Sequence, residues 1–177
     1  MATTFKGEIL ARFGWKWTSE GIIDNDKLQD SQQLLDGYCW NQGEAVWFAE
    51  DQSLADAAST TLDLRALTRD IFGSTLTVTL VDVRGILIVN AAVAADSGTL
   101  IVGDAASNEW SACFGADGDT LEVPSGSPMM LTNVRHGWDV DATNKDLKLA
   151  ASGGDLTYHI AIIGATSSGA SGSGSGA

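Results

Sequence analysis

The chain is poor in the residues that build metal and cofactor sites. It has two histidines, His136 and His159, and two cysteines, Cys39 and Cys113, in 177 residues. A catalytic zinc usually takes three protein ligands, mostly histidines or thiolates at short spacing, and neither set is present. The cysteines sit among apolar or aromatic neighbours, which favours free buried thiols, with a single bridge between them as the alternative. We therefore expect no cofactor and no catalytic metal.

Basic residues and long apolar runs are also scarce. Ten Lys and Arg stand against 23 Asp and Glu, giving a formal net charge of −13. Phosphate backbones and anionic membranes need clustered cations, so we expect neither nucleic acid nor a membrane as a partner. The longest apolar run, 85–89, is too short to span a bilayer, and the N-terminus lacks the apolar core of a signal peptide. The sequence predicts a protein made in the cytoplasm and kept there unless an assembly carries it out.

No catalytic constellation is found. There is no serine on a strand-to-helix turn and no glycine loop that could cradle a phosphate. Asp63, Asp82 and Glu122 lie on predicted strands but look isolated, whereas a glycosidase needs two facing carboxyl groups. The run 139–146 starts like a calcium loop but lacks the glycine at its sixth position and the distal glutamate. This run and 117–119 predict solvated turns, with a structural cation at a subunit contact as the alternative, and we expect no enzyme.

The strongest positive signal is a series of short alternating apolar runs between Thr60 and Gly164, split by Gly, Asp, Ser and Pro. This pattern predicts an all-β fold, an antiparallel β-sandwich that is jelly-roll-like. A short helical turn is expected at 65–73 and a helix at 24–37. Strands are expected at 45–50, 60–64, 75–81, 84–91, 99–103, 110–114, 120–123, 129–134, 146–150 and 156–163.

The segment from Phe5 to Trp17 has period-two alternation, with apolar residues on one face and the charged residues Lys6, Glu8, Arg12 and Lys16 on the other. It predicts an extended N-terminal arm, whose aromatic stripe needs cover from the chain's own sheet or from a neighbouring subunit. We divide the chain into an arm and connecting region 1–58, a sandwich 59–165 and a flexible Ser/Gly tail 166–177. The expected interface residues are Phe5, Ile9, Phe13, Trp15, Trp17, Trp40 and Trp47.

A set of short motifs covers about two thirds of the chain. Trp47 is followed by Leu62-Asp63-Leu64, and later motifs include a Trp-x-x-x-Phe at 110–114. The full set lies at 47, 62–64, 67–73, 83–90, 99–103, 110–114, 118–124 and 160–164. In this pattern the chain resembles a family of small virion proteins of tailed bacteriophages.

The resemblance implies a β-sandwich structural protein without catalytic residues. It implies a capsid decoration, or cement, protein on the capsid surface of the virion, made in the host cytoplasm. Such a protein stabilises the head by bridging subunits of the major capsid protein, and a homotrimer is expected. The alternative is a head-fibre or tail-associated module that binds a host receptor or glycan through loop residues Trp110, His136 and Trp138.

Overall fold

A computed structural model describes residues 7–9, 38–40, 44–71, 74–92 and 97–166. In these residues the chain forms strands and no helix, so the described part contains no helix that could cross a membrane. The strands are β1 (Gly7–Ile9), β2 (Tyr38–Trp40), β3 (Glu44–Leu54), β4 (Ser59–Asp63), β5 (Leu67–Ile71), β6 (Ser74–Val78), β7 (Asp82–Asn90), β8 (Thr99–Gly103), β9 (Thr120–Val123), β10 (Pro128–Thr132), β11 (Trp138–Asp139), β12 (Asp146–Ser152) and β13 (Leu156–Ala165).

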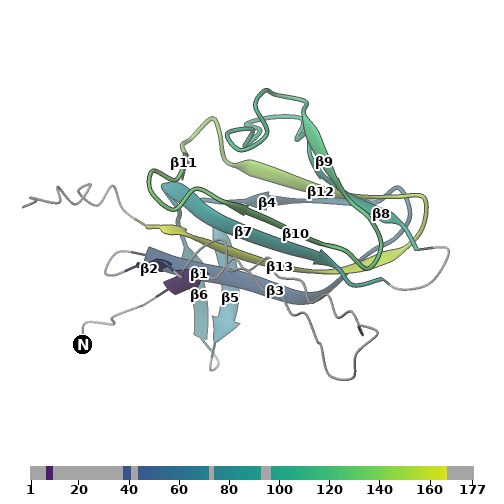
Figure 1. Ribbon diagram of the computed structural model, residues 1–177, viewed down its shortest axis with the longest axis horizontal. Coiled ribbons are helices and arrows are strands. Elements are labelled where there is room, and N and C mark those ends of the chain that lie inside the picture. The colour runs from purple at the N-terminus through teal and green to yellow at the C-terminus, as the bar shows by residue number, and fades with distance from the viewer. Residues whose placement is uncertain (1–6, 10–37, 41–43, 72–73, 93–96, 167–177) are drawn as a thin grey trace, which may run out of the picture.

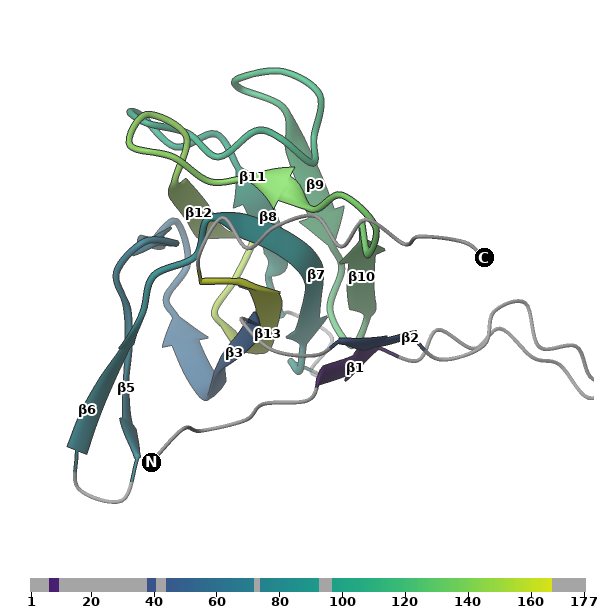
Figure 2. The same cartoon turned by 90° about the vertical axis from the view of Figure 1, so that its left-hand side faces the viewer.

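Two antiparallel sheets pack against each other around the core (Figure 1; Figure 2). The five-stranded sheet has the order β10–β7–β13–β3, with β11 paired to β7, and the four-stranded sheet has the order β4–β12–β8–β9. In chain order and without β11, the strands of the two sheets form nested pairs: β3 with β13, β4 with β12, β7 with β10 and β8 with β9. The predicted all-β fold with antiparallel sheets is confirmed. The strand order is compatible with the jelly-roll-like arrangement, a long hairpin wrapped around a core.

Alternate residues of the central strands fill the space between the sheets. Because successive side chains of a strand point to opposite faces, one apolar residue in two reaches the core. Each such side chain contributes about 1.5–3 kcal/mol when it is fully buried. The residues that are at most 2% exposed include Ile86, Ile88, Ile160 and Ile162 of one sheet and Leu100, Val102, Leu147 and Leu149 of the other.

Strand β3 is an integral part of the five-stranded sheet. It pairs with β13 along its length, from Glu44 opposite Ala165 to Leu54 opposite Leu156. Our division of the sequence placed this strand in the connecting region 1–58. Its pairing shows that the sandwich, in the part of the chain described, already begins at Glu44.

The helical turn predicted at 65–73 is wrong, because β5 and β6 form an antiparallel two-stranded ribbon. The ribbon projects from the sandwich (Figure 2) and is held at its base by buried Leu67 and Val78, which lie opposite each other. The guanidinium of Arg69 lies 3.4 Å from the centre of the Phe48 ring and donates a hydrogen bond to the Phe48 carbonyl. These contacts with β3 stabilise an extended conformation that the local sequence alone does not reveal.

The strand predicted at 110–114 is also wrong. The segment forms turns, and Trp110 is fully buried with its ring edge-on to Phe114 and Trp138, at centroid distances of 6.1 and 6.2 Å. A spacing of four residues between Trp110 and Phe114 suits a turn that brings both rings together, whereas a strand face repeats every two residues.

Several predicted features lie outside the described residues. These are the helix at 24–37, the tail from 167 and most of the arm. Within the arm, Gly7–Ile9 is a strand, β1, which pairs antiparallel with β2.

Asn90 is a fully buried polar residue that ties the two sheets together at one end of the sandwich. Its side-chain amide donates to the carbonyls of Gly98 and Val123, at 2.9 and 3.0 Å, and its carbonyl accepts the Ala92 N–H at 3.3 Å. All of its hydrogen-bonding groups are therefore used within the protein, which is what makes burial of an amide tolerable.

Replacing Asn90 with Asp tests this role. The change removes both donated hydrogen bonds and leaves a carboxyl group against two buried carbonyls, so we expect a loss of about 2–4 kcal/mol in the free energy of unfolding, measured by denaturant titration. The same change at exposed Asn108 serves as the control and should cost less than about 0.5 kcal/mol. Equal effects at the two positions would contradict the assignment.

Candidate functional site

The most distinctive described surface is the apolar outer face of the five-stranded sheet, which points away from the four-stranded sheet. One row crosses all four main strands, in which Phe48 lies beside Ala161, Ala161 beside Leu87 and Leu87 beside Met130. Leu87 and Met130 are 40% and 42% exposed, the two large apolar side chains that stand out as exposed in the described part of the chain. We call this surface the outer face and define it by Val46, Phe48, Leu87, Val89, Met130, Ala161 and Ile163.

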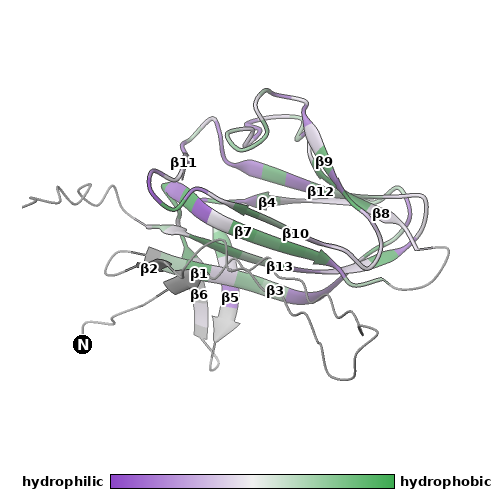
Figure 3. Ribbon diagram, viewed as in Figure 1, coloured by the Kyte–Doolittle hydropathy of each residue, from purple (hydrophilic) through white to green (hydrophobic). Residues whose placement is uncertain are grey.

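The outer face arises because β7 and β10 are apolar on both sides. In β7, Ile86 and Ile88 point into the core, so Leu87 and Val89 point outward. Figure 3 shows the hydrophobic colouring along β10 and the part of β7 that lies beside it. Antiparallel sheets with one solvated face normally alternate apolar and polar residues, so a face of this kind indicates a surface that another element contacts.

A shallow hollow of about 320 Å³ lies on the outer face between β3, β13 and β7. Phe48, Leu87 and Val89 help to line it, and Glu50 and His159 are its ionisable residues. The Nδ1 atom of His159 accepts the Asp51 N–H at 3.1 Å, which fixes the ring on β13. The hollow offers apolar contact with one acidic group at its border, which suits a side chain or a peptide segment better than a reaction.

The strand pair β1–β2 lies at the margin of the outer face. β1 contacts β3, and Figure 2 shows the pair on the side of the five-stranded sheet that faces away from the four-stranded sheet. The N-terminal part of the chain therefore starts next to the outer face.

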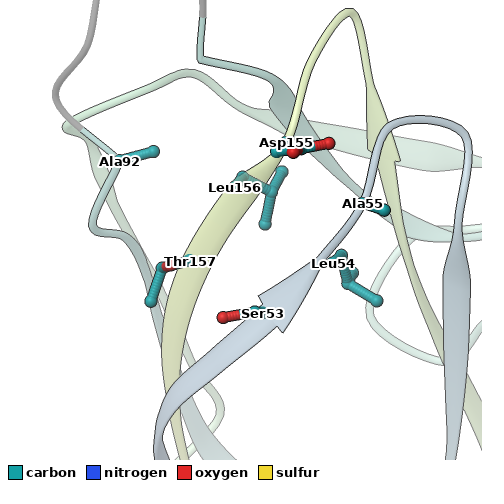
Figure 4. A pocket seen from close by; sticks show the side chains of 7 residues that line it. All are labelled: Ser53, Leu54, Ala55, Ala92, Asp155, Leu156 and Thr157. Atoms are coloured by element: carbon teal, nitrogen blue, oxygen red, sulfur yellow. The ribbon is translucent and has the colours of Figure 1, made fainter.

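A second hollow, of about 390 Å³, opens where β3 ends and β13 begins (Figure 4). Asp155 is the one ionisable residue that lines it. Its carboxylate accepts the Asp56 N–H at 2.8 Å, and the Asp56 carboxylate in turn accepts the Gly154 N–H at 3.0 Å. These reciprocal bonds join two turns, and a single carboxylate provides no partner for acid–base catalysis.

The acidic loops that resembled cation sites use their carboxylates to shape turns. Asp141 accepts hydrogen bonds from the N–H groups of Thr143 and Asn144 and from the Thr143 hydroxyl, at 2.7, 2.9 and 2.9 Å. The bond from the Thr143 N–H is the largest cause that lowers the Asp141 pKa. Glu109 similarly accepts the Asp104 and Gly118 N–H groups, both at 2.8 Å. No group of three His, Cys, Asp or Glu side chains in the described residues is placed to hold a metal ion.

Two of the three strand carboxylates considered for glycosidase chemistry, Asp63 and Asp82, are likewise engaged. Asp82 pairs with Arg84 at 3.2 Å and accepts the Ala165 N–H at 3.0 Å. Asp63 pairs with Lys145 and accepts the Arg65 N–H at 2.8 Å. Both carboxylates stabilise strand ends.

The residues predicted to form an interface separate into two groups. Trp47 is 7% exposed on the inner side of β3, and its Nε1 donates to the Thr68 carbonyl at 2.9 Å, so its ring belongs to the core. The side chains of Phe5, Ile9, Phe13, Trp15, Trp17 and Trp40 lie outside the part of the chain described in atomic detail. Their role stays a prediction.

The three residues of the alternative receptor or glycan site do not form one exposed surface. Trp110 is fully buried, Trp138 is half-buried against it, and His136 is exposed on the preceding loop. The Nε1 of Trp110 donates to the Asp139 carbonyl at 3.1 Å. Trp110 therefore packs beneath the loop that carries Trp138 and Asp139, and its ring has no exposed surface that a sugar could contact.

Sequence reasoning missed the outer face, although a signal was present. The run Gly85 to Val89 is apolar at every position, and in an antiparallel sheet such a run makes both faces of the strand apolar. We predicted a strand at 84–91 and found the run too short to span a bilayer, but drew nothing from its apolar residues on both faces.

Cys113 offers a check on burial near Trp110. It is a free thiol, and desolvation raises its pKa to about 12. At pH 8 the reactive thiolate is therefore suppressed, and we expect alkylation of Cys113 by iodoacetamide to be at least about a hundredfold slower in the folded protein than in urea. Mass spectrometry of the peptide containing Cys113 measures the rate, and equal rates in both solvents would contradict its burial.

The Asp63–Lys145 pair predicts a pH dependence of stability. Desolvation alone would raise the Asp63 pKa from 3.8, but hydrogen bonds from Lys145 and the Arg65 N–H, with the charges of both cations, lower it overall. The hydrogen bond to Asp63 is the largest cause that raises the Lys145 pKa above 10.5. The lowered carboxyl pKa stabilises the fold above pH 3.8 and loses this effect as the pH falls through the folded value. The raised amine pKa stabilises it below pH 10.5 and loses this effect as the pH rises through the folded value.

We expect the difference in free energy of unfolding between the wild type and Asp63→Asn to be constant near neutral pH and to shrink at both extremes. Denaturant titrations from pH 3 to pH 11 measure it. A double-mutant cycle with Lys145→Met is the control, and zero coupling at pH 7 would refute the pair's contribution.

Comparisons with known proteins give little further information. No protein-family model and no curated protein matches the chain. Among solved structures, a chain of the cyanophage Pam1 capsid asymmetric unit is similar, with a TM-score of 0.35 and 21% sequence identity, over 75% of this chain and 92% of that chain. At this TM-score we draw no functional conclusion from the likeness.

Proposed function

We propose that this chain is a non-enzymatic structural protein of a phage virion. In its finer form, the proposal is a capsid decoration protein that sits on the head surface as a homotrimer and bridges major capsid protein subunits. One observation supports the proposal most directly. The motifs in which the sequence resembles small phage virion proteins are made of residues that form the sandwich.

The shared motifs fall on the core and on close backbone contacts. Trp47, Leu64, Asn90 and Trp110 are buried. Gly164 is the last residue of the last motif, and it lies opposite Val83 where β13 pairs with β7. A Cβ atom at Gly164 would lie 2.0 Å from the Asp82 carbonyl oxygen. A pattern spread over the scaffold in this way supports a shared fold and provides no catalytic group to transfer.

The chemistry of the described surface supports a binding role as well. The carboxylates in its loops and strand ends hold turns and neighbouring strands, while the outer face offers an apolar area across four strands. Extended apolar surfaces on a folded domain are typical of contacts with other proteins. The receptor-binding alternative gains no comparable support, because Trp110 is buried.

Binding to capsids tests the proposal. Purified protein is added to expanded heads of the phage that encodes it, prepared without this protein, and the bound fraction is measured by sedimentation. We expect saturation at a fixed number of copies per head and a higher temperature of head disruption, because a bridging protein adds contacts between capsid subunits. Unexpanded heads serve as the matched control. The absence of binding to either form would refute the decoration role.

A further inference from the structure

We propose that the outer face of one copy binds the N-terminal segment of a second copy, residues 10–17, in an extended conformation. The inference rests on the proposed role as an assembled structural protein and names the partner of the outer face. It concerns contact between copies, so it is tested separately from capsid binding.

The first argument is the exposure of the outer face. Leu87 and Met130 remain 40% and 42% exposed in the single chain, and the hollow beside Leu87 is open. The described residues therefore leave this apolar sheet surface uncovered. Four strands about 4.8 Å apart make this surface about 14 Å wide, which is enough to seat an extended segment.

The second argument is the place where the N-terminal segment leaves the sandwich. β1 ends at Ile9, next to β3, and Ile9 pairs with Tyr38 of β2. Ile9 and Tyr38, the described residues on either side of 10–37, therefore both lie at the margin of the outer face. Extended at about 3.3 Å per residue, residues 10–17 reach about 26 Å, which exceeds the width of the sheet.

The third argument is chemical complementarity. Phe13, Trp15 and Trp17 recur at every second position, with Arg12 before the first of them and Lys16 between the last two. The hollow on the outer face is apolar and has Glu50 as the one acidic residue among its lining residues, while the Arg69 guanidinium stacks on Phe48, another residue of its lining. An alternating segment suits such a surface, because its aromatic positions contact the sheet while its cations remain near an acidic border in a chain of net charge −13.

This contact is heterologous, since the segment of one copy meets the outer face of the next. Heterologous contacts either close into a ring or continue as a filament. A ring of three copies satisfies every outer face and agrees with the proposed homotrimer.

The test compares full-length variants by light scattering after size-exclusion chromatography over a range of concentrations. The segment variant carries Phe13→Asp, Trp15→Asp and Trp17→Asp, and the face variant carries Leu87→Asp and Met130→Asp. The control variant carries Ala112→Asp and Ala142→Asp, which add the same charge as the face variant at exposed loop positions away from the outer face. We expect the wild type and the control to be oligomers and the other two variants to associate at least tenfold more weakly. Circular dichroism and thermal melting confirm that each variant is folded.

Mixing the two defective variants identifies the occupant. The face variant retains an intact segment and the segment variant retains an intact face, so an equimolar mixture should form a complex of two chains that neither forms alone. If the segment variant stays oligomeric while the face variant does not, two outer faces pack directly and the inference is overturned. A monomeric wild type, or a mixture that never associates, also overturns it.

The capsid assay separates the two proposals. A monomeric wild type that still binds expanded heads refutes the exchange of segments and leaves the decoration role standing. An oligomer that depends on both the segment and the outer face, but does not bind heads, supports the exchange of segments and refutes the decoration role.

Discussion

The pairing of the first sandwich strand with the last one organises this molecule. β13 is hydrogen-bonded to β3 on one side and to β7 on the other, so the five-stranded sheet is complete only when the chain reaches Ala165. The pairs β4–β12, β7–β10 and β8–β9 nest inside this outermost pair. These contacts join residues that are far apart in the sequence, so forming them has a large cost in conformational entropy. The core between the two sheets must offset this cost. The core and the outer face therefore depend on the same strand, β13. It supplies Ile160 and Ile162 to the core and Ala161 and Ile163 to the outer face.

Strands could be predicted where alternation and turn residues agreed. The segments 99–103 and 120–123 match β8 and β9 residue for residue, since each is a short run rich in apolar and β-branched residues with glycine and aspartate turn residues beside it. The prediction failed at 65–73 and 110–114, where distant contacts decide the conformation. Arg69 stacks on Phe48 from another strand, and Trp110 packs edge-on against Trp138, which no local pattern could place beside it.

The site was harder to predict than the fold, because both faces of β7 are apolar. A run such as Ile86 to Val89 identifies a strand, but it does not say which face meets the core and which meets a partner. That distinction required the register, in which Leu87 lies between Ala161 and Met130 on the outer side. Trp47 illustrates the same limit from the other direction. We predicted Trp47 as an interface residue because it is aromatic and close to the predicted arm. Its position on β3 points its ring into the core instead.

The described carboxylates show how an acidic chain can use its charges to hold turns and strand ends together. Asp56 and Asp155 bridge two turns, Asp82 holds a strand end, and Asp141 shapes a loop, each through N–H groups of the backbone. At Asp141 these bonds lower the pKa of the carboxyl group, which therefore has little tendency to take up a proton near neutral pH. The same bonds make the loops rigid, so the acidic groups contribute to the shape of the surface as well as its charge. In the described part of the chain, the outer face is the surface with the large exposed apolar side chains, so burying it would give a favourable hydrophobic contribution to a contact.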